Sequence, residues 1–335
     1  MPKEKRILID SHGRNHSYLR ISIIERCNLR CTYCMPKQGI PLSPKSHLMT
    51  YEEIYQIASV FVKNGVTKIR LTGGEPLIRK DIHIILEKLS SLKVELSITT
   101  NAILIDRFIN ILKRNGVKKI NTSLDSLSAN KFEHITRRND FNKTYENILL
   151  LVKENFDVKI NIVLIKGFNE NEIIDFIELT KELPVVVRFI EFMPFSGNEW
   201  DLSKLVSYEE IMNNVFSTYS ENTVLKLEDA PNDTSKNYKV KSYKGSFAVI
   251  SSVTNPFCDS CNRIRLTADG KLKNCLFSAQ ENDLLGKLRI GKAIESTIQK
   301  SINLKKKIRG GMNTMDSFQQ TKAHSKNRSM ITIGG

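Results

Sequence analysis

All six cysteines of this 335-residue sequence fall into two triplets. The first triplet has the spacing C-x3-C-x2-C and the second has C-x2-C-x13-C; their members are Cys27, Cys31 and Cys34, then Cys258, Cys261 and Cys275. Compact triplets with no cysteine left over favour metal binding or catalysis over a disulfide framework, which is typical of exported proteins. The chemistry of this chain is therefore expected at these two cysteine groups.

Three cysteines suit an iron-sulfur cluster that also binds a ligand. A [4Fe-4S] cluster takes four thiolate-type ligands when fully coordinated, so three cysteines leave one iron open to a substrate or cofactor. The alternative is a structural zinc site, which normally has four protein ligands. His16 or His47 could complete such a site around the first triplet.

Strand-like and helix-like segments alternate from Tyr18 onward. The pattern predicts strands over 18–24, 68–71, 95–100, 120–124, 159–165 and 185–192. It predicts a helix after Thr50, whose spacing to Glu53 is that of a capping box, and helices over 81–89, 106–114, 145–154 and 170–181. Such alternation predicts a parallel sheet with its chemistry on the loops after the strands. These loops carry Cys27, the turn Gly73–Pro76, Thr99–Asn101, Ser123–Asp125, Lys166 and Glu191–Met193.

The alternation stops near Val206. Residues 220–237 are polar and loop-like, and residues 238–253 have the pattern of a hairpin that turns at Lys244 and Gly245. We place a domain boundary near residue 215, which gives domains of residues 1–215 and 216–335. The basic tail ends in two glycines, and disorder is the ordinary expectation for such an ending.

Composition restricts the possible partners. The formal net charge of +15 indicates an anionic partner, which could be nucleic acid, an acidic membrane surface or a polyanionic small molecule. No apolar run approaches the roughly 18 residues of a membrane span, so we expect no membrane insertion. The N-terminal segment lacks the features of a signal or transit peptide, so we expect a cytoplasmic protein.

Two long motifs resemble a known family. The segment YLRISIIERCNLRCTYCMP, followed by KIRLTGGEPLIR, resembles the N-terminal motifs of the radical S-adenosylmethionine (SAM) GTP 3′,8-cyclases. The segment CNRIRLTADGKLKNCLF resembles the second cluster motif of the same family. The resemblance extends along nearly the whole chain. It implies an α/β fold, a partial (βα)6 TIM-type barrel with a C-terminal iron-sulfur domain that covers the barrel opening.

The resemblance also implies a reaction and its cofactors. One [4Fe-4S] cluster reduces SAM and yields a 5′-deoxyadenosyl radical, which takes the hydrogen from the 3′ carbon of GTP. The resulting carbon radical adds to carbon 8 of guanine, while a second [4Fe-4S] cluster orients the base. The product, 3′,8-cyclo-7,8-dihydro-GTP, passes to the cyclic pyranopterin monophosphate synthase at the start of molybdenum cofactor biosynthesis. An external one-electron donor and a homodimer are further implications.

Individual residues take roles from the same resemblance. The expected SAM-binding residues are Tyr33, Gly74, Glu75, Ser123 and Met193. The expected GTP-binding residues are Arg20, Arg70, Thr99, Lys166, Arg188, Arg263 and Arg265. Gly334 and Gly335 resemble a double-glycine tail that reaches the active site and is needed for activity. The chain departs from the family at Ala102, where Gly is common, which puts the local turn in doubt.

Two other functions compete with this reading. A radical enzyme that modifies a peptide or RNA would share the barrel and the auxiliary cluster. A basic RNA-binding or regulatory protein would instead use its cysteines for zinc or a sensing cluster and would need no cofactor turnover. Aromatic residues make up only 7% of the chain and no RNA-recognition motif with stacking pairs occurs, so we expect no nucleic-acid partner.

Overall fold

The fold is known from a computed structural model, which describes residues 8–319 and 327–335. In these residues twelve strands form one sheet in the order β12-β11-β10-β1-β2-β3-β4-β5-β6-β9-β8-β7. The strands are β1 (Tyr18–Ser22), β2 (Lys68–Thr72), β3 (Glu95–Thr100), β4 (Lys119–Ser123), β5 (Asp157–Leu164), β6 (Val186–Glu191), β7 (Val224–Lys226), β8 (Lys236–Val240), β9 (Ser246–Ile250), β10 (Arg263–Leu266), β11 (Lys271–Lys273) and β12 (Asn282–Asp283).

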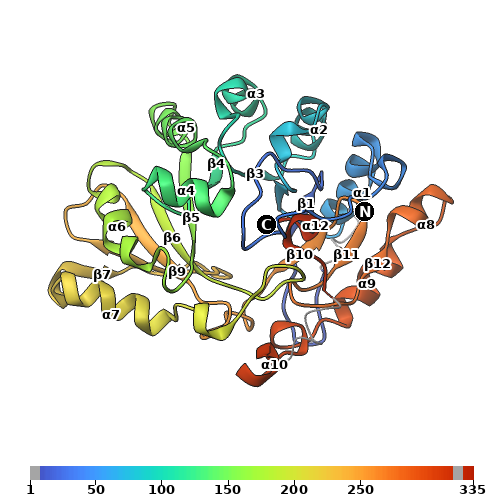
Figure 1. The fold of residues 1–335 in the computed structure, drawn as a ribbon. Helices are drawn as coiled ribbons and strands as arrows, with labels where there is room; N and C mark the ends of the chain where they lie inside the picture. The colour runs from blue at the N-terminus through green and yellow to red at the C-terminus, as the bar shows by residue number, and fades with distance from the viewer. Residues whose placement is uncertain (1–7, 320–326) are drawn as a thin grey trace.

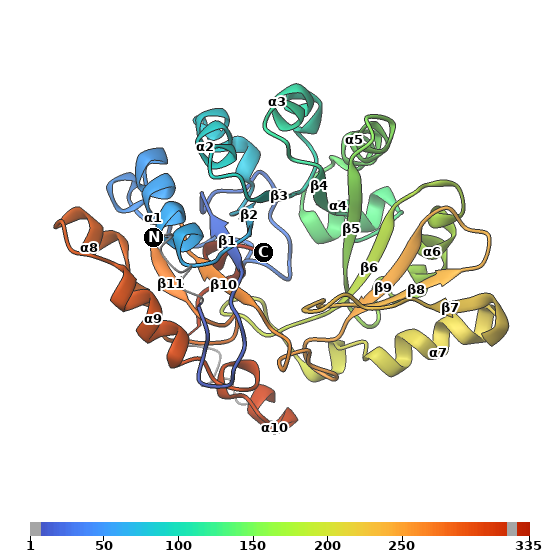
Figure 2. The same ribbon diagram turned by 180° about the vertical axis from the view of Figure 1, so that it is seen from behind.

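Helices cover the outer face of the curved sheet (Figures 1 and 2). The α-helices are α1 (Tyr51–Lys63), α2 (Ile82–Ser90), α3 (Ile109–Arg114), α4 (Ala129–Thr136), α5 (Phe141–Lys153), α6 (Ile173–Glu182), α7 (Tyr208–Thr218), α8 (Leu285–Arg289), α9 (Glu295–Asn303), α10 (Met315–Gln319) and α12 (Met330–Ile333). Short α12 differs from the others, because it lies within the curve of the sheet together with the C-terminus (Figure 1). The interior of the sheet is therefore reached by the end of the chain.

The six predicted strands form the centre of the sheet and run parallel, which confirms the partial barrel. The C-terminal part does more than cover an opening. Its strand β10 pairs in parallel with β1 at one side, and its strand β9 pairs in parallel with β6 at the other. The predicted hairpin is present as β8 and β9. A sheet that runs through both parts fixes the C-terminal loops against the barrel.

Local sequence signals explain most of these elements. Thr50 and Glu53 form the predicted capping box at the start of α1. Helices α4 and α7 were not predicted, although α7 begins at a second capping box made by Ser207 and Glu210. In β5 every second residue is buried under the helices, so the intervening residues face the barrel interior.

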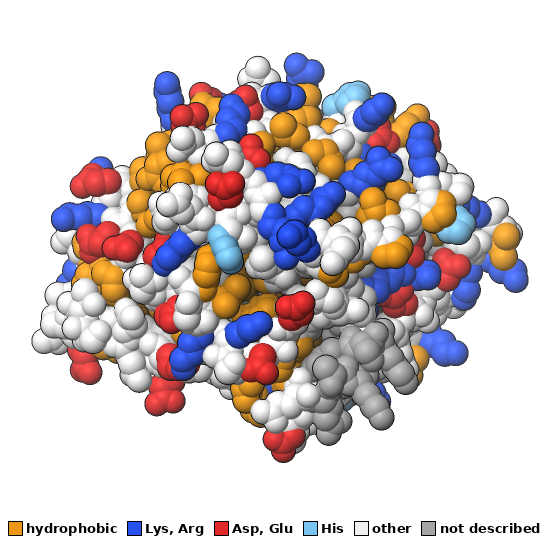
Figure 3. All heavy atoms as spheres, in the orientation of Figure 1, with side chains coloured by type: hydrophobic (Ala, Val, Ile, Leu, Met, Phe, Trp, Pro, Cys, Tyr) orange, Lys and Arg blue, Asp and Glu red, His pale blue; other side chains and the backbone are white. Residues whose placement is uncertain are grey.

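Acidic and basic side chains are interspersed on the face drawn in Figure 3. A group of basic side chains nevertheless gathers near the centre of this face. In the described part of the chain, no helix has both the length and the apolar character needed to cross a bilayer.

Candidate active site

One cavity of about 300 Å³ brings the two cysteine triplets together. All six cysteines line it, and all six are free of disulfide bonds. Its walls also include residues from strands β1 to β6 and from the C-terminal tail. Folding therefore joins two groups that are far apart in the sequence.

The two triplets lie at opposite ends of the parallel strands. The loop Cys27–Cys34 follows β1 and so lies at the carboxyl end. The second triplet begins just before Arg263, which opens β10 and pairs in parallel register with Tyr18 at the start of β1. Cys275 follows β11, which runs antiparallel to β10 and returns to that amino end. The expectation that all the chemistry lies after the strands is therefore wrong for the second triplet.

The cysteines of the first triplet are half-buried and lie close to acidic groups. Burial and Glu75 raise the pKa of Cys27 to about 11, and burial and Cys27 raise the pKa of Cys34 to about 12. Burial and Asp125 raise the pKa of Cys31 well above its ordinary value. Thiols in such surroundings need a nearby cation to become thiolates, and iron would supply that charge.

The second triplet has donors aimed at its sulfur atoms. Lys305 Nζ donates to Cys261 Sγ at 3.3 Å, and the backbone N–H of Arg309 donates to Cys258 Sγ at 3.4 Å. Although burial opposes ionisation, Arg263 and Lys305 lower the pKa of Cys261 to about 6. These contacts stabilise a thiolate ligand.

Neither triplet is arranged around a single ion. In residues 8–319 and 327–335, no three His, Cys, Asp or Glu side chains are spaced to hold one metal ion. The cysteine ligands of a [4Fe-4S] cluster bind different iron atoms, so they lie further apart than the ligands of one zinc ion. The residues present therefore fit a cluster better than the zinc alternative.

The glycine-rich turn after β2 packs against the segment that leads to Cys27. The backbone N–H of Gly74 donates to the carbonyl of Ile24 at 2.7 Å. A Cβ atom at position 74 would lie 2.1 Å from the carbonyl oxygen of Arg26. Glycine is required here because the two backbone segments are in contact.

Glu75, which follows in this turn, is a buried carboxylate on the cavity wall. It accepts hydrogen bonds from the backbone N–H groups of Leu77 and Asn101 at 3.0 and 2.7 Å, and from Thr100 Oγ1 at 2.8 Å. Burial raises its pKa to about 7. Carboxylate oxygens have further lone pairs, so Glu75 can also accept a hydrogen bond from a ligand ammonium group.

Asp125 is a second buried carboxylate on this wall, and the sequence analysis gave it no role. Its Oδ2 accepts from Tyr33 Oη at 2.9 Å, and its Oδ1 accepts from the backbone N–H of Val163 at 2.9 Å. Burial raises the pKa of Asp125 to about 6. Its position two residues after Ser123, at the end of a predicted strand, could have identified Asp125 as a site residue from the sequence. Tyr33, Ser123 and Met193 also line the cavity.

Arginines on the strands line the cavity between the triplets, together with Thr99 on β3. They are Arg20, Arg70, Arg188, Arg263 and Arg265. Arg20, Arg70 and Arg265 stand side by side, because β2 and β10 pair with β1 in parallel at these positions. A cationic group thus crosses the interior of the barrel.

Arg70, Arg188 and Arg265 are buried, and the half-buried Arg20 and Arg263 crowd against them. Burial lowers the pKa of Arg70 to about 10, and burial with repulsion from Arg70 lowers that of Arg188 to about 9. Arg188 Nη2 donates to Asn121 Oδ1 at 2.8 Å, but the Nε atoms of Arg20 and Arg188 have no partner among the described residues. Unused donors on crowded guanidinium groups suit a polyanionic ligand.

Lys166 must be corrected as a predicted ligand. It lies beyond the end of β5, its ammonium pairs with Glu210, and about half of its side chain is exposed. It is not among the residues that line the cavity.

Lys159 is the lysine that the sequence analysis overlooked. It alternates along β5 with Asn161 and Val163, both of which line the cavity. Lys159 itself does not line the cavity, but it pairs in register with Asn121, the hydrogen-bond partner of Arg188. Burial and repulsion from Arg188 lower the pKa of Lys159 to about 8. The period of the strand was the signal, since residues 159, 161 and 163 share one face.

Residues 327–335 are ordered and reach the cavity at Met330, Ile331 and Gly335, so the expectation of disorder is wrong for them. Gly335 lines the cavity, and the carbonyl of Gly334 accepts a hydrogen bond from Arg265. Gly334 has φ +85°, and an added Cβ would lie 2.5 Å from Thr72 Oγ1. Both its backbone angle and its surroundings favour glycine.

Comparisons with known proteins agree with this arrangement. Residues 21–180 match the Radical SAM superfamily, and residues 185–310 match the family Molybdenum Cofactor Synthesis C. "GTP 3′,8-cyclase, mitochondrial" of Arabidopsis thaliana is 45% identical, over 98% of this chain and 84% of the relative. The chain belongs to the GTP 3′,8-cyclase family.

Other relatives of this chain differ in length. The GTP 3′,8-cyclase of Peptoclostridium acidaminophilum is 42% identical, over 90% of this chain and 93% of the relative. Human "Molybdenum cofactor biosynthesis protein 1" is 44% identical over 97% of this chain, which spans only 51% of that relative. Among solved structures, Streptococcus suis SuiB bound to S-adenosylmethionine has a TM-score of 0.62 at 15% identity, over 96% of this chain and 78% of that one. This likeness shows the radical SAM fold.

Ala102, the departure from the GTP 3′,8-cyclase pattern, keeps the turn that glycine would make. Its φ is +65°, in the left-handed region, and its side chain is buried. Its N–H donates to Thr100 Oγ1 at 3.1 Å, and its carbonyl accepts from Asn147 Nδ2 at 2.7 Å. These hydrogen bonds hold the strained conformation.

Proposed function

We propose that this protein converts GTP to 3′,8-cyclo-7,8-dihydro-GTP, the first step of molybdenum cofactor biosynthesis. The observation that carries the proposal is a single cavity lined by both cysteine triplets and by five strand arginines, three of which are buried. Membership of the GTP 3′,8-cyclase family supports the same activity.

The first triplet would hold one [4Fe-4S] cluster and leave its fourth iron to SAM. When reduced, this cluster supplies the electron that releases a 5′-deoxyadenosyl radical from SAM. The surrounding wall would bind the cofactor. Glu75 offers a fixed carboxylate for the methionyl ammonium group, and Gly74 lets the backbone approach closely. The other proposed contacts are Tyr33, Ser123 and Met193.

The arginine group would bind the triphosphate. Arg70 and Arg188 present buried guanidinium donors and Arg20 a half-buried one, and Lys159 replaces Lys166 as the proposed lysine ligand. A hydrogen bond to a charged group contributes about 1.5–3 kcal/mol, so a few of these residues suffice for tight binding. Phosphate would also relieve the mutual repulsion of the cations.

The second triplet would hold the other [4Fe-4S] cluster at the amino end of the strands, and three cysteines would leave it a coordination position for the nucleotide base. Arg263 and Arg265 on β10 and Thr99 on β3 would contact the nucleotide between the clusters. The tail would enclose the site at Gly334 and Gly335 and exclude water from the radical reaction.

Further parts of the proposal are a homodimer, an external one-electron donor, transfer of the product to the cyclic pyranopterin monophosphate synthase, and a cytoplasmic location. The domain boundary near residue 215 also stays a prediction.

Anaerobic reconstitution with iron and sulfide tests the activity. The loaded protein is expected to contain about eight irons per chain, as two cubane clusters require. With dithionite, SAM and GTP it should release 5′-deoxyadenosine together with a cyclised guanine nucleotide. Productive SAM cleavage with a peptide or RNA, but not with GTP, would contradict the proposal.

A further inference from the structure

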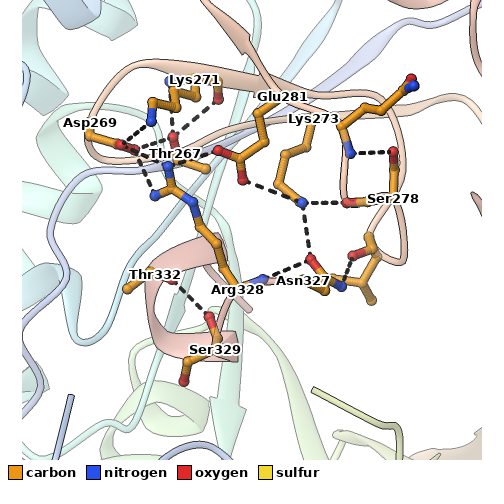
Figure 4. Close-up of polar contacts among 12 residues, drawn as sticks. Thr267, Asp269, Lys271, Lys273, Ser278, Glu281, Asn327, Arg328, Ser329 and Thr332 are labelled. Atoms are coloured by element: carbon orange, nitrogen blue, oxygen red, sulfur yellow. Dashed lines mark hydrogen bonds and ion pairs between the residues drawn. The ribbon is translucent and has the colours of Figure 1, made fainter. Parts of the chain in front are cut away.

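A polar cluster outside the cavity holds the C-terminal tail (Figure 4). We name it the tail latch, and it consists of Asp269, Lys273, Glu281, Asn327 and Arg328. Three of these residues belong to the segment around β10, β11 and β12, and two belong to the tail. The reaction proposed above gives none of them a role.

Arg328 forms ion pairs with two carboxylates. Its Nη1 and Nη2 atoms donate to the two oxygens of Asp269 at 2.9 and 2.7 Å, and Nη2 also lies 2.7 Å from Glu281 Oε2. The Arg328 side chain is 21% exposed, and the two carboxylates are 11% and 14% exposed. A two-pronged ion pair that is largely shielded from water is a strong and directional contact.

Lys273 joins the latch from a fully buried position. Its Nζ donates to Asn327 Oδ1 at 3.0 Å and to the carbonyl of Ser278, and lies 3.4 Å from Glu281 Oε1. Asn327 in turn donates through Nδ2 to the carbonyl of Leu276 at 3.1 Å. A buried ammonium group requires such partners, so this lysine fixes the start of the described tail.

The latch places the tail between the two cysteine groups. Asn327 contacts the carbonyl of Leu276, which follows Cys275, while Ser329 Oγ donates to the carbonyl of Cys34 at 2.9 Å. Three consecutive tail residues therefore bridge the loops of both triplets. Beyond them the short helix α12 leads to Gly334, whose carbonyl accepts a hydrogen bond from Arg265.

We propose that Arg328 is a positioning residue, which through Asp269 and Glu281 keeps Gly334 and Gly335 in the cavity during turnover. Arg328 does not line the cavity, so it acts only through the tail. The inference rests on the proposed function for its activity readout, but the position of the tail can be measured independently.

Hydrogen exchange of the cluster-loaded protein, followed by mass spectrometry, reports on the tail directly. Arg328→Ala should speed exchange of amides 330–335 by about tenfold or more, since it removes hydrogen bonds to charged groups. Arg328→Lys keeps the positive charge but cannot donate two parallel hydrogen bonds to Asp269, so it should speed the exchange less than Arg328→Ala. The matched control is Arg289→Ala, which breaks the 2.7 Å ion pair of Arg289 with Glu53 at a site away from the tail. This variant should leave the exchange of amides 330–335 unchanged.

Turnover gives the second readout. Arg328→Ala should retain its iron but yield about tenfold less cyclised nucleotide per 5′-deoxyadenosine. The control Arg289→Ala should give the same yield as the unaltered protein. Unchanged exchange in Arg328→Ala overturns the latch. Faster exchange with an unchanged yield overturns the role in turnover. If Arg328→Ala fails to fold, Arg328→Lys and Asp269→Asn decide by the same two measurements. Absence of GTP turnover in the unaltered protein refutes the proposed function alone, because the exchange experiment does not depend on it.

Discussion

Replacing Lys159 by Met tests the electrostatics of the proposed phosphate site. Lys159 is surrounded by charge, because Arg188, Arg70 and Lys68 repel its ammonium while Asp233 attracts it. Burial and Arg188 lower its pKa from 10.5 to about 8. The lysine is therefore about nine-tenths charged at pH 7 and about one-tenth charged at pH 9.

The direction of the pH effect follows from linkage. A bound triphosphate stabilises the ammonium and returns its pKa toward the ordinary value, so GTP binding takes up a proton above pH 8. The Kd of the unaltered protein should then rise about tenfold between pH 7 and pH 9, equivalent to about 1.4 kcal/mol. Lys159→Met should bind GTP at least about tenfold more weakly at pH 7, because a hydrogen bond to a charged group is lost. The difference in Kd between Lys159→Met and the unaltered protein should become smaller toward pH 9.

Anaerobic calorimetry of the cluster-loaded protein measures both quantities. Titrations in buffers of different ionisation enthalpy count the protons taken up with GTP. The matched control is Lys166→Met, since Lys166 pairs with Glu210 outside the cavity. Ionisation of GTP itself affects all three proteins equally and cancels in the comparison.

Two results would refute this reasoning. Lys166→Met could weaken binding as much as Lys159→Met, which would mean that the lysine beyond the strand is the ligand. Alternatively, Lys159→Met could retain the full pH dependence, which would mean that Lys159 does not titrate with binding.

Three further predictions concern the clusters and the stability of the fold. Cys275→Ala should lower the iron content from about eight to about four per chain and abolish GTP cyclisation, as measured by iron assay and product analysis. Ala102→Gly should raise the free energy of unfolding by up to about 1 kcal/mol in urea denaturation, because φ +65° strains alanine. Burial and Lys305 lower the pKa of His16 from 6.5 to about 4, so the unfolded state takes up the proton first. His16 should therefore contribute a loss of about 3 kcal/mol in the free energy of unfolding between pH 6.5 and pH 4. Urea denaturation should show this loss as a difference between the unaltered protein and His16→Asn, because Glu75 and Asp125 titrate in the same range in both proteins. An equal loss in the variant would contradict the assignment to His16.

Signals within a few residues could be read from the sequence. Cysteine spacing indicated the clusters, the Thr50–Glu53 capping box located the start of α1, and alternating apolar segments predicted six parallel strands. Each of these depends on neighbouring residues, whose geometry along a helix, strand or turn is nearly fixed.

The alternation of residues along a strand also showed which side chains face the barrel interior, but this signal was easily missed. Lys159 and Lys166 both belong to the segment VKINIVLIKG, and the resemblance alone favoured the second. Only the first lies within β5, in phase with the cavity residues Asn161 and Val163. A strict count of the alternation would have selected it.

What the sequence by itself determined was therefore the kind of chemistry and the partial barrel, since both are encoded by residue type and short-range periodicity. Only the tertiary structure decided that β10 joins β1, which places the second triplet at the amino end of the strands and the arginines between the two cysteine groups. It also decided that Arg328 of the tail pairs with Asp269 and that Gly335 lies on the cavity wall. Pairings between residues so distant in the chain depend on packing of the whole sheet, and no local pattern encodes them.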